Sequence, residues 1–275
     1  MSGGGGIECL GNDGYRMSTS CRFAVFIKEF SEFLRDGFGL GEHQFDIALL
    51  VEGLRNFAEL DAIAKSEKIR KENRKEIQRL LGGAGKPSGD VSKLSRDIQF
   101  QLYLSVKFDL SGFKVENLEP GSMFEYKNSS YSVAAKRINS ESKIHARFSK
   151  AKKQIKNSGV NGFIAFSIDR IVWDKIKTDS YIVSGYPDTL YNAGQTILHD
   201  LLQTKIRKAA WDDRDPFVVG HIASLTVPAI LPKLLSFGFS STQLFIPSFD
   251  VLGESIVNQH IKELSEKMKW PPARQ

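Results

Sequence analysis

The stretch from Ser95 to Arg170 constrains the fold of this chain more than any other part. Hydrophobic periodicity and turn residues predict that it forms one helix, three strands, a second helix and a fourth strand. The predicted elements are Arg96–Phe108, Phe113–Leu118, Met123–Tyr126, Tyr131–Ile138, Ser140–Asn157 and Gly162–Ile168. Helices and strands that alternate within one stretch indicate an α/β domain.

Two short motifs mark the second and third of these strands. Glu119-Pro120-Gly121 opens the second strand, and Ala134-Ala135-Lys136-Arg137 ends the third. Residues i and i+2 of a strand point to the same face, so Ala134 and Lys136 lie on one face and Arg137 on the other. A lysine at the end of an apolar strand is costly to bury alone, so we expect Lys136 to meet an acid or a phosphate.

The element order and these two motifs resemble the catalytic core of the PD-(D/E)XK nuclease superfamily, which has a restriction-endonuclease-like fold. The resemblance spans Ser95 to Arg170. It implies a hydrolase in which two acids hold Mg²⁺ and a lysine orients or deprotonates the attacking water. DNA or RNA is then the partner. In bacteria such folds often serve in restriction, repair or antiviral defence.

Both acids of the superfamily pattern differ in this chain. Gly121 stands where Asp follows the proline, and Ala134 stands where Asp or Glu precedes the lysine. One hypothesis is that other side chains complete the site. The candidate metal ligands are Glu119, Glu125 and Glu141, and the candidate catalytic residues are Lys136, Glu119, Asp97 and Gln101. The other hypothesis is a degenerate nuclease fold that binds nucleic acid or a protein partner subunit without cutting.

Asp97 and Gln101 enter this list because they lie four apart on one face of the first helix, a helix that often contributes to the active-site rim in the superfamily. A surface aspartate near a helix start, stabilised by the helix dipole, is the alternative interpretation of Asp97.

The predicted helix Ser140–Asn157 carries the strongest charge pattern. From Lys136 to Lys156 there are eight basic residues and one acid, Glu141. The basic residues are Lys136, Arg137, Lys143, Arg147, Lys150, Lys152, Lys153 and Lys156. Cations that neutralise phosphates give an affinity that falls steeply with salt. We therefore predict nucleic-acid contacts from Arg137, Lys143, Arg147, Lys150, Lys153 and Gln154, and a solvated basic face is the alternative.

Sequence patterns along the whole chain predict four regions. These are a helical N-terminal region (1–81), a linker rich in Gly, Pro and Ser (82–92), the nuclease-like core (93–180) and an α/β C-terminal extension (181–275). Residues 64–81 mix basic and acidic side chains at helical spacing, which indicates a solvated face or an arm that docks on a partner. In the extension we expect helices over 187–210 and 252–268, and strands over 217–227 and 237–249, with His221 a hydrogen-bonded core residue.

Composition adds little beyond this. The net charge of +6 favours a polyanionic partner modestly. Cys9 and Cys21 form neither a disulfide framework nor a zinc pattern. No apolar run approaches the roughly 20 residues that span a bilayer, and the start lacks the pattern of a signal segment. We therefore expect a cytoplasmic protein that does not contact membranes.

Overall fold

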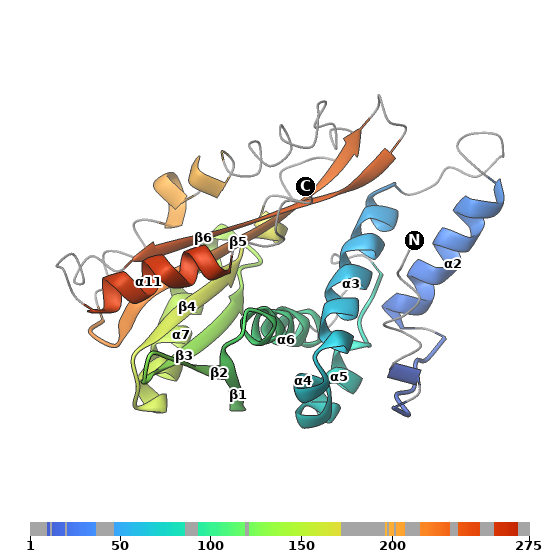
Figure 1. The fold of residues 1–275 in the computed structure, drawn as a ribbon. Coiled ribbons are helices and arrows are strands. Elements are labelled where there is room, and N and C mark those ends of the chain that lie inside the picture. Colours follow the sequence, from blue (N-terminus) through green and yellow to red (C-terminus); the bar gives the residue numbers. More distant parts are fainter. Residues whose placement is uncertain are drawn as a thin grey trace. The chain divides into compact units, whose positions relative to one another are not determined.

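The structure is a computed structural model of a mixed α/β protein (Figure 1). It describes residues 10–11, 13–19, 21–36, 47–85, 93–118, 121–171, 196, 198–200, 202–206, 215–231, 236–247 and 256–268. The chain divides into two compact units. The N-terminal unit comprises Met1–Tyr103, Ile176–Leu190 and Val227–Ser240, and the sheet unit comprises Leu104–Lys175, Tyr191–Thr226 and Ser241–Gln275.

One sheet orders the described strands as β1-β2-β3-β4-β5-β6. The strands are β1 (Lys114–Leu118), β2 (Gly121–Tyr126), β3 (Ser129–Arg137), β4 (Gly162–Ser167), β5 (Val218–Leu231) and β6 (Ser236–Pro247). Strands β1, β2 and β3 are antiparallel neighbours, whereas β3, β4 and β5 run parallel. Helix α6 (Leu94–Leu110) precedes β1, and helix α7 (Ile144–Ser158) connects β3 to β4. The order of helix, three strands, helix and strand is therefore as predicted.

The β2–β3 hairpin is closed by a loop of two residues. Lys127 and Asn128 both have positive φ, 46° and 62°. A two-residue loop with two positive φ values matches the right-handed twist of the flanking strands. At the far end of α7, Gly159 adopts φ 72° and ends the helix with a left-handed residue. Local sequence thus fixes both the hairpin and the length of α7.

An aromatic cluster covers the face of the sheet opposite α7. Phe108 of α6 stacks on Phe124 with ring centroids 4.3 Å apart, and Phe124 also stacks on Phe163. Ser105 of α6 bonds Ser122 of β2 through their hydroxyl groups. Aromatic rings packed in this way bury large apolar areas, so this face is the main core of the sheet unit.

Helix α11 (Ile256–Lys267) packs on the same face of the sheet as the aromatic cluster and contacts the β2–β3 hairpin. The Tyr131 hydroxyl bonds His260 Nδ1 at 2.6 Å. Glu263 accepts hydrogen bonds from Lys127, at 2.8 Å, and from Tyr126. These two bonds lower the pKa of Glu263 to about 2. The C-terminal part of the chain therefore joins the core directly.

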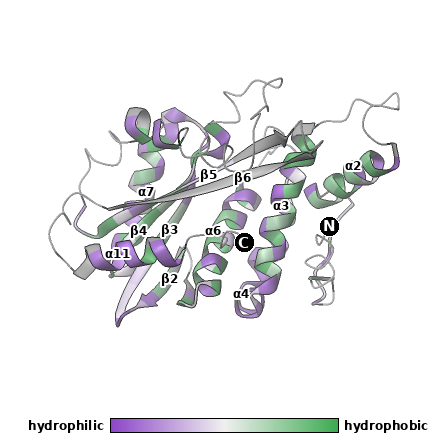
Figure 2. Cartoon of the chain, turned by 45° about the horizontal axis from the view of Figure 1, so that its top comes forward, coloured by the Kyte–Doolittle hydropathy of each residue, from purple (hydrophilic) through white to green (hydrophobic). Residues whose placement is uncertain are grey.

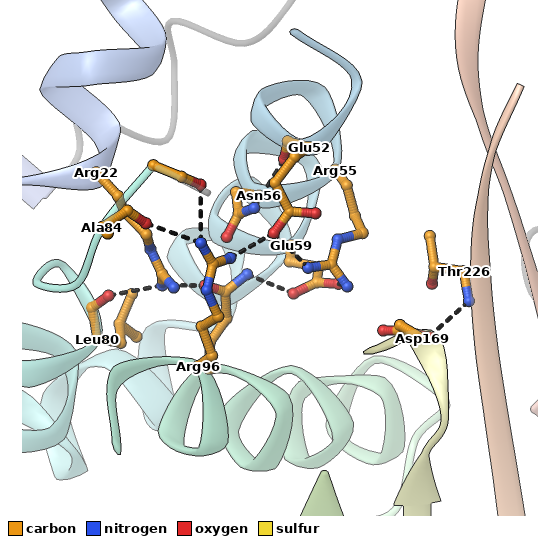
Figure 3. Close-up of polar contacts among 12 residues, drawn as sticks. Arg22, Glu52, Arg55, Asn56, Glu59, Leu80, Ala84, Arg96, Asp169 and Thr226 are labelled. Atoms are coloured by element: carbon orange, nitrogen blue, oxygen red, sulfur yellow. Dashed lines mark hydrogen bonds and ion pairs between the residues drawn. The ribbon is translucent and has the colours of Figure 1, made fainter. Parts of the chain in front are cut away.

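The extension that we expected to begin at residue 181 supplies a strand to the sheet of the core. Strand β5 pairs with β4 through a parallel register that includes Ile164 opposite His221. Asp169 accepts a hydrogen bond of 2.8 Å from the backbone N–H of Thr226, as Figure 3 shows. The predicted strands of the extension exist, but they continue the sheet of the core. Of the helix expected over 187–210, only 196, 198–200 and 202–206 lie within the described residues.

The N-terminal unit is helical, as predicted. Its helices are α2 (Arg22–Asp36), α3 (Ile47–Lys65), α4 (Glu67–Glu72), α5 (Arg74–Leu80) and the first part of α6. Phe23 and Phe26 of α2 are fully buried and pack on Phe57 of α3. In the part of the chain that the structure describes, no helix is long and apolar enough to cross a bilayer.

The mixed-charge segment 64–81 forms two short helices separated at Asn73. The Ser66 side chain caps α4 by accepting from the Ile69 N–H at 3.3 Å. The buried Asn73 side chain donates to the Ile69 carbonyl at 2.9 Å, which satisfies that group at the break. Several cations here pair with nearby acids, including Lys65 with Asp61 at 2.6 Å and Arg70 with Asp13 at 2.8 Å. Such pairs are typical of a solvated face.

A buried network of charged side chains joins α2, α3 and α6 within this unit (Figure 3). The Glu52 carboxylate accepts from Arg55 at 2.7 Å and also from Arg96. Gln99 links Arg22 to Glu59 by accepting from the first and donating to the second. Glu52, Arg55 and Arg96 are each at most 4% exposed. Buried charges are tolerated because they are paired and hydrogen-bonded.

Arg96 also holds the start of the predicted linker. Its Nη2 donates to the Ala84 and Gly85 carbonyl oxygens, both at 2.8 Å. A Cβ atom on Gly85 would lie 3.0 Å from Val25, so the backbone passes close to α2. Residues 82–85 are therefore a packed part of the N-terminal unit, which corrects the linker boundary at 82. Residues 86–92 lie outside the described ones.

We predict that Glu52→Gln lowers the free energy of unfolding by about 3–5 kcal/mol, because two buried guanidinium groups then lose their shared carboxylate. Asp61→Asn is the matched control, since its partner Lys65 is exposed, and its cost should stay below about 1 kcal/mol. Urea unfolding of both variants measures the difference. Equal losses would contradict a structural role for the buried network.

Candidate functional site

Lys136 and Gln154 form the centre of the candidate site. Lys136, near the end of β3, donates a hydrogen bond from Nζ to Gln154 Oε1 of α7 at 2.7 Å. Both side chains are half-buried. The sequence had predicted that Lys136 meets an acid or a phosphate, and the structure places an amide oxygen at that position. Gln154 was predicted as a nucleic-acid contact on the basic helix.

The two positions that lack acids lie beside this pair. Gly121 is adjacent to Ala134, because Ser122 pairs with Val133 in the antiparallel register of β2 and β3. A Cβ atom on Gly121 would lie 2.5 Å from Gln154 Nε2 and 2.8 Å from the Val133 carbonyl oxygen. Ala134 is 1% exposed. The amide of Gln154 therefore fills the space that a side chain at position 121 would need.

Helix α7 lies over β3, β4 and β5 through one apolar stripe (Figure 2). The stripe consists of Ile144, Phe148, Ala151 and Ile155, all at most 3% exposed. Phe148 packs on Phe166 with ring centroids 5.2 Å apart. The flank of α7 that carries Gln154 thus faces Lys136 and Gly121, and the flank that carries Lys152 faces β5.

Basic residues cover the exposed surface of α7. Lys150, Lys153 and Lys156 of the helix are exposed, as is Lys143 in the turn that precedes it, and Arg147 is half-buried. Among the described residues, none of the four lysines has an ion-pair partner. The helix itself contains no acid, since Glu141 lies in the preceding turn Glu141–Lys143. The predicted basic surface is present, with its charge unneutralised by neighbours on the helix.

Two predicted members of that surface are buried instead. Arg137 is 7% exposed, because alternation along β3 directs it to the face opposite Lys136. Lys152 is also 7% exposed, because it follows Ala151 in the stripe that packs on the sheet. Neither side chain belongs to the exposed surface of α7. Charge counting along the sequence did not separate them from the exposed lysines.

His221 of β5 lies under the Lys152 flank of α7. It is 3% exposed, and its ring centroid is 5.6 Å from that of Phe148. Within the described residues, neither ring nitrogen has a hydrogen-bond partner, so the expected hydrogen-bonded core histidine is not found. Burial and then the positive charge of Lys152 lower the pKa of His221 to about 4. The sequence alone gave no signal that linked His221 to Lys152.

The candidate acids lie elsewhere or outside the described residues. Glu125 pairs with Lys114 of β1 at 2.8 Å and is opposite Ser130. Six residues of strand separate Ser130 from Lys136, which is about 20 Å. Glu141 precedes α7, whereas Gln154 lies about 15 Å along that helix from its start. Glu125 is therefore far from the Lys136–Gln154 pair along the sheet, and a metal-binding role of Glu141 stays a prediction.

Three further candidates remain predictions. Glu119 lies outside the described residues. Asp97 and Gln101 are half-buried residues in the part of α6 that belongs to the N-terminal unit.

The side chains around Lys136 do not fit the Mg²⁺ site that the resemblance implies. Magnesium is bound in proteins through carboxylates together with water or phosphate oxygens. Gly121 and Ala134 supply no oxygen ligand from their side chains, and the Gln154 amide occupies the space between them and α7. Among the described residues no group of three His, Cys, Asp or Glu side chains is arranged to hold a metal ion. The arrangement favours an anion beside Lys136 over a cation.

Comparison of the chain with protein-family models, curated proteins and solved structures found no match.

Gly121→Ala should lower the free energy of unfolding by about 1–3 kcal/mol, because the added methyl group meets the Val133 backbone and the Gln154 amide. Gly11→Ala is the control, since a Cβ atom there meets nothing within 4 Å. Thermal or urea unfolding gives both values. If Gly121→Ala is as stable as the native chain, the site has room for a side chain at this position.

The buried His221 should make the protein less stable in mild acid. Its folded-state pKa of about 4 lies below the usual histidine value of 6.5, so the unfolded chain binds the proton more readily. The contribution of His221 to the free energy of unfolding is therefore fully present above about pH 6.5. It decreases as the pH falls toward 4, by at most about 3 kcal/mol. Urea unfolding between pH 7.5 and 4.5 should show a weaker pH dependence for His221→Leu. An unchanged pH profile in that variant would show that His221 is not responsible.

Proposed function

We propose that this protein binds nucleic acid through the exposed basic surface of α7 and does not cut it. The observation that carries the proposal is a helix with three exposed lysines and no acid, preceded by the exposed Lys143 in the turn before it, and none of these four lysines is ion-paired within the described residues. Each cation that neutralises a phosphate releases counterions, so such a surface favours a polyanion. The cations of α4 and α5, several of which pair with acids, supply no comparable surface.

The resemblance to the nuclease superfamily supports the same partner. The structure has the order of helix, three strands, helix and strand on which the resemblance rests. Lys136 lies on the α7 face of the sheet, next to the two positions where the superfamily has acids. We therefore propose a nuclease-like core that has kept a nucleic-acid surface. A role in bacterial restriction, repair or antiviral defence follows from the resemblance alone.

Loss of cleavage follows from the same residues. Two acids normally attract the divalent cation that stabilises charge on the displaced oxygens. Here glycine and alanine occupy those positions, and Gln154 fills the space at Gly121. Without carboxylates at either position, the lysine has no metal-bound water to act on. Glu119 is the one candidate acid next to Gly121 in sequence, so it is included in the test.

Binding should weaken linearly with the logarithm of salt concentration, and neutralising two lysines should lower the salt slope by about 1.4 to 1.8. Fluorescence anisotropy with labelled DNA and RNA, comparing the native chain with the double variant Lys143→Gln and Lys150→Gln, measures this slope. Lys71→Gln is the control, because Lys71 already pairs with Glu67 in the N-terminal unit. Absence of salt-sensitive binding to every nucleic acid would overturn the proposal.

Incubation of the same nucleic acids with the protein and Mg²⁺ or Mn²⁺ tests the proposal that the protein does not cut them. We expect no cutting by the native chain. Metal-dependent cutting that is lost in both Lys136→Ala and Glu119→Ala would instead establish an active nuclease in which Glu119 replaces a missing acid.

A further inference from the structure

One flank of α7 carries a line of polar side chains that leads to Lys136. With 100° of rotation per residue, Arg147 and Lys150 of α7, and Lys143 at the N-cap of this helix, each project within about 40° of the direction of Gln154. Successive members of the line are about 4.5 to 6 Å apart along the helix axis. Because Gln154 hydrogen-bonds Lys136, this direction is the one that faces the site. The three cations are therefore on the site side of the helix.

The remaining exposed lysines do not share this direction. Lys156 follows Gln154 by two residues and points about 160° away from it. Lys153 points about 100° away from Gln154. The basic surface of α7 thus has a site side, with Lys143, Arg147 and Lys150, and an outer side, with Lys156.

The end of the site side that lies at Lys136 is partly covered. Lys143 and Lys150 are exposed, whereas Arg147, Gln154 and Lys136 are half-buried. A ligand that contacts the whole line must lie along the helix and still reach an ammonium group partly covered by α7. A flexible single strand can adjust each phosphate separately, whereas the two strands of a duplex are held in a fixed geometry. Single-stranded nucleic-acid sites commonly use a positively charged surface that follows one backbone.

From these observations we infer that the line Lys143, Arg147, Lys150 and Lys136 is a track for the phosphate backbone of one nucleic-acid strand, with Gln154 holding Lys136 until a phosphate takes its place. This inference rests on the proposed function. A phosphate oxygen is an ionised acceptor and forms a stronger hydrogen bond with an ammonium group than a neutral amide does. The described exposed residues of α7 include no Phe, Tyr or Trp on which bases stack. Binding should accordingly be insensitive to base sequence.

The first test compares strands and matched lysines by anisotropy. A single-stranded 12-mer should bind at least about tenfold more tightly than the duplex of the same sequence, with a salt slope near 2.8 from about four phosphate contacts. Lys150→Gln should lower that slope by about 0.7, whereas Lys156→Gln, the same change on the outer side, should leave it unaltered. Equal effects of the two substitutions would show a diffuse basic surface and would overturn the track.

The second test addresses Gln154. Gln154→Glu nearly preserves shape and places a carboxylate beside Lys136, so single-strand affinity should fall at least about tenfold. Ser149→Glu adds the same charge on the outer side, about 140° from Gln154, and should cost less than about threefold. Circular dichroism and unfolding of each variant confirm that the fold is retained. If Gln154→Glu and Ser149→Glu weaken binding equally, Lys136 takes no phosphate.

The results separate the two proposals. Absence of salt-sensitive binding removes the proposed function and with it the track. Salt-sensitive binding with duplex preferred, or without a difference between Lys150→Gln and Lys156→Gln, keeps the proposed function and removes only the track.

Discussion

The packing of one apolar stripe of α7 on the parallel strands β3, β4 and β5 determines which of its polar residues can act. Once Phe148 and Ile155 face the sheet, every other position on the helix has a fixed direction. Lys152 is then buried toward His221, and Gln154 faces Lys136. The exposed lysines lie on the part of the helix surface that does not pack on the sheet. The proposed binding surface is thus a consequence of core packing in the sheet unit.

Positive charge is treated differently in the two units. In the N-terminal unit, buried guanidinium groups share the carboxylates of Glu52 and Glu59, and several surface cations pair with acids. Because these charges are matched, they stabilise structure and contribute little attraction for a distant polyanion. On α7 no acid opposes the lysines from the helix itself. Net charge alone, +6 for the whole chain, does not distinguish these two cases.

The site beside Lys136 has glycine and alanine at the two positions where the resemblance implies acids. Gly121 and Ala134 bring no charge, and the amide of Gln154 fills the adjacent space. A pair of carboxylates would attract a cation and repel a phosphate in its absence, whereas lysine and a neutral amide accept a phosphate directly. The neutral side chains beside Lys136 are therefore compatible with the phosphate contact that we propose.

Local sequence patterns were sufficient for the order of elements and for the basic helix, because hydrophobic periodicity acts over a few residues. They were insufficient for Arg137 and Lys152, whose burial depends on which faces of β3 and α7 the rest of the chain covers. They also gave no signal of two contacts between distant parts of the chain. Residues 82–85 pack through Arg96, and β5 extends the core sheet through a pairing with a distant strand.

The sequence by itself determined the order of helix, three strands, helix and strand, the glycine and alanine at positions 121 and 134, and a lysine-rich helix with the single acid Glu141 near its start. Only the tertiary structure decided that Gln154 hydrogen-bonds Lys136, that its amide occupies the space at Gly121, and that Lys143, Arg147 and Lys150 project toward the same side. The physical reason is that composition and spacing fix which residues an element contains, whereas the rotation of α7 about its axis is fixed by long-range packing on the sheet.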